Sequence, residues 1–318
     1  MKYKQIDKEE RKCIAAYLNE GKTPAEIAEI LNRPRSTISR EIKRNSTNKG
    51  YNPVTAQKKY RKRRRNCVPK NKLEANQEIY DKVIIGLELY FSPEQIHNTI
   101  CKEVGISTIY RAIKKKIIPK KYMYKFRRFR IQTGPKKGSK QKNKPCFRPI
   151  IERAKEVEKR EEFGHWELDT VMFHRKTKKC IATMVERKTR FTIINLMPDY
   201  SAKSMMKAII SELGKFPANM RKTITTDRGR EFTCWQKVED ALKGTKLYAT
   251  DPQRPYQKGT VENTNGLIRQ FFPKHHYKGE PSQNQISAVN SLLNLRPRKC
   301  LNFSSPSQVF FNESICCS

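Results

Sequence analysis

The chain has 318 residues, enough for two or three domains that include a catalytic core. Its 68 Lys and Arg residues outnumber its 31 Asp and Glu residues and give a formal net charge of +37. An excess of this size predicts a polyanionic partner, most simply a phosphate backbone. The excess is uneven, because residues 101–150 carry 17 basic and 1 acidic residue, whereas residues 151–318 carry 29 basic and 18 acidic residues. A uniformly basic, ribosome-like protein is therefore not expected.

The cysteines and the N-terminus exclude several other classes. Nine cysteines are dispersed along the chain without a CxxC pair, so neither a zinc ribbon nor a disulfide framework is supported. The N-terminal sequence MKYKQIDKEERK has no apolar segment, and no long apolar run follows it. We expect a cytoplasmic protein with reduced thiols rather than a secreted or membrane protein.

Residues 1–50 are predicted to form a helix-turn-helix DNA-binding domain. In TPAEIAEIL, Thr23 is a good N-cap and Glu26 completes a capping box. STISREIKR begins a second helix, with Ser36 as the expected cap and Ile38 facing inward. A small structural hairpin is the alternative. The candidate DNA contacts on the exposed face of the second helix are Arg35, Ser36, Thr37, Ser39, Arg40 and Arg44.

The next segments repeat this organisation. Residues 51–72 are expected to be a basic linker in which Arg63 and Arg64 follow phosphates or enter a minor groove, unless the run is simply solvated. Residues 73–118 are predicted to form a second helix-turn-helix, with Ser92 and Gln95 as a capping box. This unit either reads DNA or packs against a partner chain. Its candidate DNA contacts are Thr108, Tyr110 and Arg111.

Residues 119–160 are expected to be a second basic linker. Aromatic residues from Tyr122 to Phe129 alternate with Lys and Arg, a pattern that suits stacking on nucleic acid and equally suits a strand entering the next domain. The stretch from Thr133 to Lys144 is typical of a flexible connection.

The periodicity changes after residue 160. HWELDTVMF, CIATMVER and RFTIINLM predict three successive strands, which TITT and KLYAT extend to five. The segments SAKSMMKAIISEL, EFTCWQKVEDAL and GTVENTNGLIRQFF predict helices between and after them. This order predicts a ribonuclease-H-like α/β domain over residues 161–318, with a mixed five-stranded sheet and flanking helices, in which the first strand lies beside a later parallel strand.

Three acidic residues occupy positions that folding alone does not explain. Asp169 interrupts the first strand, Asp227 ends a buried strand, and Glu262 lies near the start of a predicted helix. Carboxylates that converge in this way can hold two divalent cations, Mg²⁺ or Mn²⁺. Glu167, on the same strand face as Asp169, could replace or support it. Asp251 is expected to have a turn role.

Other polar residues are expected to be peripheral. Glu186 follows a strand beside two basic residues and is interpreted as a surface hairpin residue. The histidines His165, His174, His275 and His276 lack the spacing of zinc ligands, so surface positions are expected for them.

Several long strings together resemble the IS-thirty family of insertion-sequence transposases. These strings are GHWELDTV, VERKTRF, TTDRGREF, DPQRPYQKGTVENTNGLIRQFFPK and LNLRPRKCLNFSSPSQVF. The resemblance covers about residues 163–311, and the N-terminal helix-turn-helix agrees with it. It implies that Asp169, Asp227 and Glu262 form a metal-binding triad. It also implies cleavage at transposon ends followed by strand transfer from the freed 3′ hydroxyl.

The resemblance also implies partners. The expected partner is double-stranded DNA, namely the terminal inverted repeats and the target. A homodimer or larger assembly is expected on that DNA. The expected location is the nucleoid in a prokaryotic cytoplasm. Asn265 and Arg269, three and seven residues after Glu262, are further candidate DNA contacts. The remaining alternatives are a regulator without catalysis and a metal-dependent nuclease without strand transfer.

Overall fold

The computed structural model describes residues 5–67, 71–126, 146–173, 177–252, 254–273 and 279–316. The chain divides into two compact units, Met1–Asn71 and Lys72–Ser318. Within the described ranges, no helix combines the length and the apolar character needed to cross a bilayer.

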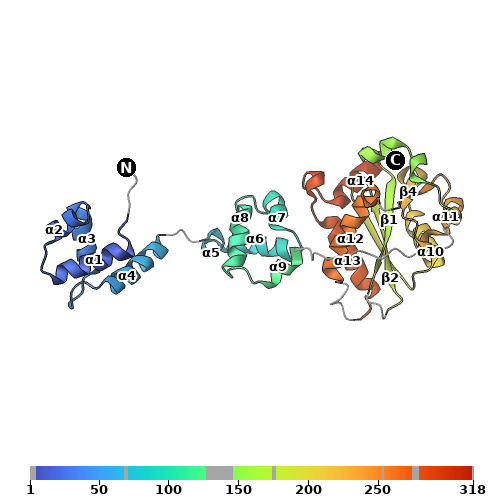
Figure 1. Cartoon of the computed structure of the whole chain (residues 1–318). Coiled ribbons are helices and arrows are strands. Elements are labelled where there is room, and N and C mark those ends of the chain that lie inside the picture. Colours follow the sequence, from blue (N-terminus) through green and yellow to red (C-terminus); the bar gives the residue numbers. More distant parts are fainter. Residues whose placement is uncertain are drawn as a thin grey trace. The chain divides into compact units, whose positions relative to one another are not determined.

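The described residues of the first unit form the helices α1 to α4 (Figure 1), which pack around a small core rich in isoleucine. They are α1 (Lys8–Asn19), α2 (Pro24–Ile30), α3 (Arg35–Asn45) and α4 (Pro53–Asn66). Ile14, Ile27 and Ile38 are completely buried between them. The capping box of Thr23 and Glu26 is confirmed. The cap expected at Ser36 is wrong, because α3 begins at Arg35, directly after Pro34, and has no side-chain cap.

Residues 53–66 were expected to lie in a basic linker, but they form helix α4 of the first unit. The Asn52 side chain accepts hydrogen bonds from the amides of Val54 and Thr55, and Pro53 occupies the first helical position. Ala56 is completely buried, and α4 packs against α1. The Lys and Arg residues that follow are good helix formers, so the charge run continues the helix instead of disrupting it. Arg63 and Arg64 are therefore carried on a packed helix.

The second unit begins with five helices that have a core of their own. They are α5 (Lys72–Ala75), α6 (Gln77–Glu88), α7 (Pro93–Thr99), α8 (Ile106–Lys114) and α9 (Lys121–Phe126). The capping box of Ser92 and Gln95 is confirmed. A Cβ atom at Gly86 would lie 2.6 Å from the side chain of Ile96, so glycine permits the close approach of α6 and α7. Residues 121–126 of the expected second linker are helical, and residues 127–145 lie outside the described residues.

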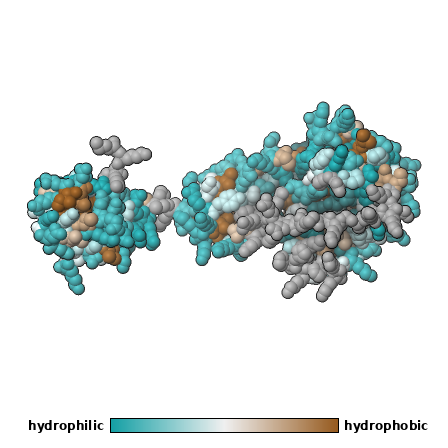
Figure 2. Space-filling model, in the orientation of Figure 1, coloured by the Kyte–Doolittle hydropathy of each residue, from teal (hydrophilic) through white to brown (hydrophobic). Residues whose placement is uncertain are grey.

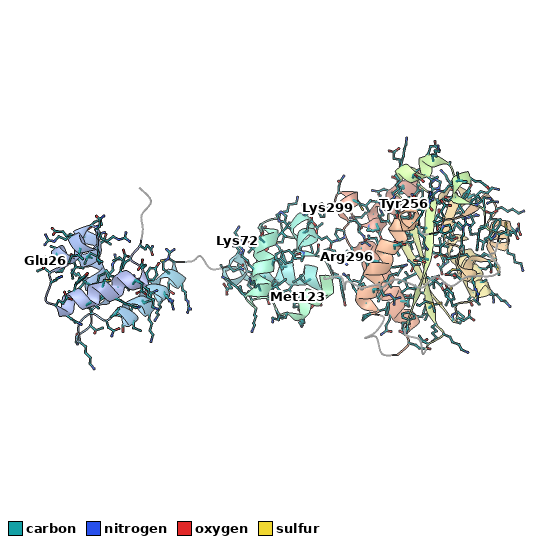
Figure 3. All side chains as sticks on the ribbon, viewed as in Figure 1. Glu26, Lys72, Met123, Tyr256, Arg296 and Lys299 are labelled. Carbon is teal, nitrogen blue, oxygen red and sulfur yellow. The ribbon has the colours of Figure 1, made fainter. Side chains whose placement is uncertain are left out.

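The start of α7 contacts the C-terminal segment of the same unit. Lys299 Nζ lies 2.7 Å from Glu94 Oε1, and Arg296 Nε donates to Gln95 Oε1 at 3.2 Å (Figure 3). The polar side chains of this helix are therefore at least partly engaged in contacts within the protein.

A mixed five-stranded sheet forms the centre of the second unit, as expected. Its strands are β1 (His165–Met172), β2 (Cys180–Glu186), β3 (Thr192–Met197), β4 (Thr223–Thr226) and β5 (Lys246–Ala249). Their order is β3-β2-β1-β4-β5. The pairs β1–β2 and β2–β3 are antiparallel, whereas β1–β4 and β4–β5 are parallel.

Helices cover both faces of this sheet (Figure 1). One face packs against α10 (Ala202–Leu213) and α11 (Trp235–Ala241), and the other packs against α12 (Gly259–Phe271) and α13 (Gln283–Leu295). A further helix, α14 (Pro306–Cys316), adds Phe310 to the first core. Trp166 and Leu168 point into the α10 core and Val171 into the α12 core. By this alternation, the odd-numbered residues of β1, including Asp169, face α12.

The face of the molecule seen in Figure 2 is mostly hydrophilic.

Candidate active site

The strand register brings Asp169 and Asp227 to the same level of the sheet. Glu167 of β1 pairs with Thr225 of the parallel strand β4. Asp169 lies two residues after Glu167, in the middle of β1, and Asp227 lies two residues after Thr225, just beyond the end of β4. Parallel neighbours advance together, so the two carboxylates are adjacent. This adjacency is what the sequence predicts from a first strand lying beside a later parallel strand.

A lysine that the sequence analysis did not select joins the two aspartates. Lys258 Nζ lies 3.0 Å from Asp169 Oδ1 and 2.9 Å from Asp227 Oδ2. Lys258 is only 5% exposed. Burial opposes its charge, but the carboxylates of Asp169 and Asp227 outweigh this effect and raise the pKa of the ammonium group. The sequence signal that could have identified Lys258 is its position one helical turn before Glu262, just ahead of α12.

Two neighbours orient the aspartates further. The Asn265 carboxamide donates from Nδ2 to Asp169 Oδ2 at 2.7 Å, so this expected DNA contact lies against an acidic residue of the site. The backbone N–H of Gly229 donates to Asp227 Oδ1 at 2.9 Å. Both side chains therefore have defined rotamers, which a pre-organised site requires.

Glu262 lies on α12 in an exposed position. Partial burial raises the pKa of its carboxyl group, and the charges of Asp169, Glu167 and Asp227 raise it further, while Lys258 acts in the opposite direction. Glu262 is thus within electrostatic range of both aspartates. Among the described residues, however, no three acidic, histidine or cysteine side chains form a ready-made metal cluster. The three carboxyl groups therefore interact electrostatically, but they do not form such a cluster.

Arg269 is placed away from these carboxylates. It is half-buried near the end of α12, where Nη1 donates to the carbonyl of Phe272 at 3.5 Å, and burial lowers the pKa of its guanidinium group. The structure brings Asn265 to Asp169 but gives Arg269 no contact with the aspartates.

Glu167 holds helix α12 in place. It is completely buried, and Oε2 accepts hydrogen bonds from the backbone N–H groups of Thr260 and Val261 at 2.8 and 2.9 Å. Its other oxygen pairs with Arg187 Nη1 at 2.8 Å. A carboxylate at a helix N-terminus satisfies unpaired amides and interacts favourably with the helix dipole. Both oxygens of Glu167 are engaged in this way, so Asp169 is the β1 carboxylate that faces Lys258.

Glu231 is a further acidic residue that the sequence analysis did not select. It is 3% exposed, and Thr170 Oγ1 donates to its Oε1 at 3.4 Å. A Cβ atom at Gly229 would lie 2.2 Å from Glu231 Oε2 and 2.8 Å from Asp227 Oδ1, so the two carboxylates flank this glycine. Burial raises the pKa of Glu231, and the charges of Asp227 and Asp169 add to the shift. Glu231 is therefore a buried carboxyl group whose protonation depends on the charges of both aspartates.

Two expectations about peripheral residues are wrong. Glu186 is completely buried and accepts hydrogen bonds from the amides of Gly164, His165 and Thr189, so it closes the β2–β3 connection from inside. His165 is 4% exposed. The turn role expected for Asp251 agrees with its hydrogen bonds to the Gln257 side chain. His174, His275 and His276 lie outside the described residues.

The buried His165 predicts a pH dependence of stability. Burial lowers the pKa of the ring below its ordinary value of 6.5, although hydrogen bonding to Glu162 acts in the opposite direction. Below pH 6.5 the unfolded chain takes up a proton that the folded chain resists, so the free energy of unfolding falls. Urea unfolding of the parent and of His165→Gln between pH 7.5 and 5 should show a smaller fall in the variant. Equal slopes would contradict this account.

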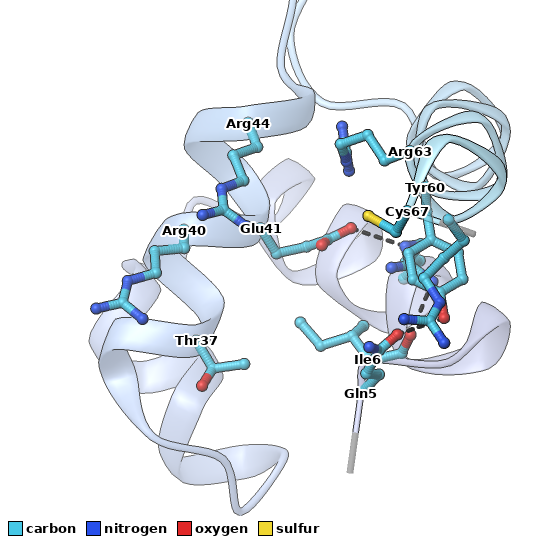
Figure 4. A pocket seen from close by; sticks show the side chains of 11 residues that line it. Gln5, Ile6, Thr37, Arg40, Glu41, Arg44, Tyr60, Arg63 and Cys67 are labelled. Carbon is cyan, nitrogen blue, oxygen red and sulfur yellow. Dashed lines mark hydrogen bonds and ion pairs between the residues drawn. The ribbon is translucent and has the colours of Figure 1, made fainter. Parts of the chain in front are cut away.

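A basic groove lies between α3 and α4 of the first unit (Figure 4). Its volume is about 340 Å³, and its lining includes Arg40 and Arg44 from α3 and Arg63 and Arg64 from α4. Its one acidic lining residue, Glu41, is paired with the buried Arg11 at 2.7 Å. Arg63 Nη2 donates to the uncharged Asn45 side chain at 2.9 Å. The groove therefore keeps a surplus of positive charge.

The remaining candidate DNA contacts are mostly accessible. Arg35, Ser36, Tyr110 and Arg111 are exposed, and Thr37, Ser39 and Thr108 are partly exposed. Arg111 Nε donates to the Ser107 carbonyl at 3.2 Å. In the first unit these side chains lie on α3, the second helix of the helix-turn-helix, from which such motifs read DNA. In the second unit they lie on α8.

Comparison with known proteins agrees with this organisation. A family described as "Helix-turn-helix domain" matches residues 2–45, and one described as "Integrase core domain" matches residues 159–255. The transposase InsI for insertion sequence element IS30A of Escherichia coli (strain K12) is 33% identical over 320 residues, covering 94% of this chain and 82% of the relative. The transposase for insertion sequence element IS1086 of Cupriavidus metallidurans is 33% identical over 322 residues, covering 97% and 94%.

Two further matches were found, one to a relative and one to a solved structure. The transposase for insertion sequence element IS4351 of Bacteroides fragilis is 33% identical over 316 residues, covering 96% of this chain and 95% of the relative. Among solved structures, the catalytic core domain of BIV integrase is 17% identical with a TM-score of 0.38, covering 48% of this chain and 97% of that one.

The helix-turn-helix unit and the integrase core define the class of protein, a DNA-binding polynucleotidyl transferase with a ribonuclease-H-like catalytic domain. The use of divalent metal ions is implied for this class. The extent of the full-length matches settles the family: the chain belongs to the IS30 (IS-thirty) family of insertion-sequence transposases.

Proposed function

We propose that this transposase binds the terminal inverted repeats of its own element, cleaves phosphodiester bonds at the element ends and transfers the freed strands to target DNA. Asp169, Asp227 and Glu262 are the proposed metal-holding residues. The observation that carries this assignment is the parallel register that makes Asp169 and Asp227 adjacent, with a cationic group between them. A pocket that already holds a buried ammonium group is one that attracts positive charge.

The donor set fits two Mg²⁺ or Mn²⁺ ions, because hard divalent cations prefer carboxylate oxygens. Bound ions would activate the attacking oxygen and stabilise the leaving oxygen of an in-line displacement. The protein's own part is positional. Asn265 and Gly229 hold the rotamers of the two aspartates, and Glu167 fixes the start of α12, the helix that carries Glu262.

The groove of the first unit is the proposed site of terminal DNA recognition. We propose that α3 enters a major groove, with the contacts made by Arg35, Ser36, Thr37, Ser39, Arg40 and Arg44. Arg63 and Arg64 on α4 are positioned to hold the phosphate backbone beside it. Thr108, Tyr110 and Arg111 would add contacts from the second helix-turn-helix, and Arg269 a phosphate contact at the catalytic domain.

Synapsis of two element ends calls for at least a homodimer on the DNA. We place the protein at the nucleoid of a prokaryotic cytoplasm, where its DNA substrate lies. The alternatives, a regulator without catalysis or a nuclease without joining, have no support in the comparisons. The three relatives described above are named as transposases.

Arg40 is expected to discriminate between sequences. It is exposed on α3 and lines the groove. Arg40→Ala should weaken binding to a duplex carrying the element's terminal sequence by about 1–3 kcal/mol more than binding to random duplex, measured by fluorescence anisotropy. Arg64→Ala on α4 is the matched control, and it should weaken both duplexes equally. Equal losses for Arg40→Ala would reassign it to phosphate contact.

The cleavage step is tested directly on a labelled duplex that contains one element end joined to flanking DNA. With Mg²⁺ present, we expect a cut at the junction that leaves a 3′ hydroxyl on the element strand, and no cut with EDTA. Specific binding of this duplex without any metal-dependent cut would contradict the proposed catalytic role.

A further inference from the structure

Lys258 occupies the position between the two aspartates that the cleavage chemistry requires to be free. It is the last residue of the short 3-10 helix η5 (Pro255–Lys258), and α12 begins at the next residue. Its ammonium group contacts one oxygen of each carboxylate, Asp169 Oδ1 and Asp227 Oδ2. With 5% exposure, this is a buried, doubly paired cation rather than a surface lysine.

An ammonium group and a divalent cation cannot share these oxygens. Both would occupy the space that faces Asp169 Oδ1 and Asp227 Oδ2, and both carry positive charge, so they repel each other strongly in a partly buried site. The ammonium also offsets the negative charge that would attract a metal ion. Metal loading therefore requires that Lys258 moves away.

The displaced ammonium needs another anion, because leaving a buried charge unpaired is costly. Three other acidic groups lie nearby. Glu231 is 3% exposed and accepts a hydrogen bond from Thr170 at its own place beside Gly229. Glu167 is already engaged with Arg187 and with the start of α12, and Glu262 is itself a proposed metal-holding residue. The anion that arrives with the substrate is a phosphate of the DNA backbone, and the flexible four-carbon stem of lysine allows such a change of partner.

We propose that Lys258 is a positioning residue that exchanges partners, from Asp169 and Asp227 in the free protein to a phosphate of bound DNA. The exchange couples metal loading to DNA binding, so that the metal site is completed on the substrate and stays closed without it. This inference rests on the proposed metal-holding role of the aspartates. Coupling of two ligands through one shared group is reciprocal, so metal ions would strengthen DNA binding by the same factor.

Mn²⁺ affinity tests the exchange, measured by electron paramagnetic resonance on the full-length chain with and without an element-end duplex. In Lys258→Met, which removes the charge and keeps the stem, we expect the free protein to bind Mn²⁺ roughly tenfold tighter than the parent. The gain in affinity on adding DNA should be smaller in this variant than in the parent by a similar factor. DNA phosphates bind Mn²⁺ themselves, so the comparison is between the gains of the two proteins.

Two variants serve as controls. Lys258→Arg keeps the cation and should behave as the parent, whereas Lys203→Met removes an equal charge from an exposed position on α10 and should leave both affinities unchanged. Lys258→Gln provides the same test should Lys258→Met fail to fold. The proposed exchange is overturned if free Lys258→Met binds Mn²⁺ with the affinity of the parent. It is also overturned if DNA raises the Mn²⁺ affinity of this variant as much as that of the parent. If Asp169→Asn and the parent bind Mn²⁺ equally with and without DNA, the proposed metal site itself fails.

Discussion

Asp227→Asn should reduce metal-dependent DNA cleavage by at least about a thousandfold, because metal ions supply several kcal/mol of transition-state stabilisation and each 1.36 kcal/mol is tenfold in rate. The substitution keeps the size of the side chain and an oxygen that can accept from the Gly229 amide, so the local fold should persist. The lost charge is one of the two that face Lys258. Single-turnover cleavage of the element-end duplex measures the effect.

The matched control for this prediction is Asp240→Asn on α11, where the aspartate is exposed. It should cleave at the rate of the parent. Both variants should bind the duplex within about twofold of the parent, because the proposed DNA-reading residues are unchanged. A cleavage rate for Asp227→Asn close to that of the parent would remove this residue from the mechanism.

Glu167→Ala should lower the free energy of unfolding of the second unit by about 3–5 kcal/mol, the usual cost of leaving one member of a buried ion pair without its partner. The substitution leaves the buried Arg187 without its carboxylate partner and the amides of Thr260 and Val261 without their acceptor. Both tryptophans of the chain, Trp166 and Trp235, lie in this unit, so tryptophan fluorescence during urea unfolding reports its stability.

Glu161→Ala is the corresponding surface control, and it should change the stability by no more than about 0.5 kcal/mol because Glu161 is exposed. The double variant Glu167→Gln with Arg187→Met should recover part of the loss, since no unpaired charge remains. A loss below about 1 kcal/mol for Glu167→Ala would show that Glu167 does not anchor α12.

The sequence was sufficient to predict the elements that hold the aspartates. Strand alternation places Asp169 on one face of β1, and the order of strands and helices predicts that β4 lies beside it. Both follow from local periodicity and from the topology of parallel strands. The caps at Thr23 and Ser92 are predictable for the same reason, because a capping motif involves neighbours along the chain.

Contacts between distant segments could not be predicted in this way. Lys258 is 89 residues from Asp169 along the chain, and nothing local distinguishes it from a solvated lysine. Glu186, the last residue of β2, precedes two basic residues, as a surface residue would, yet it faces inward because the amides of Gly164 and Thr189 need an acceptor there. Burial of a polar group depends on the partners that tertiary structure supplies.

For the basic helix α4, in contrast, the sequence contained local signals for the observed structure. Composition alone suggested a solvated linker, because a run of like charges repels itself. The Asn52 cap, Pro53 and the buried Ala56 fix the start of the helix against α1, and the later arginines extend it into solvent. The cap at Asn52 and Pro53 at the first helical position therefore outweighed the composition of the segment.

A strand-transfer assay tests the central claim most directly. It uses the full-length chain, a pre-cleaved element-end duplex with a free 3′ hydroxyl, a supercoiled target plasmid, and Mg²⁺ or Mn²⁺, with Asp169→Asn run in parallel. The account predicts joined products from the parent that disappear with Asp169→Asn and with EDTA. Joined products from Asp169→Asn at the rate of the parent, or a parent that binds the duplex and never joins it, would contradict the account.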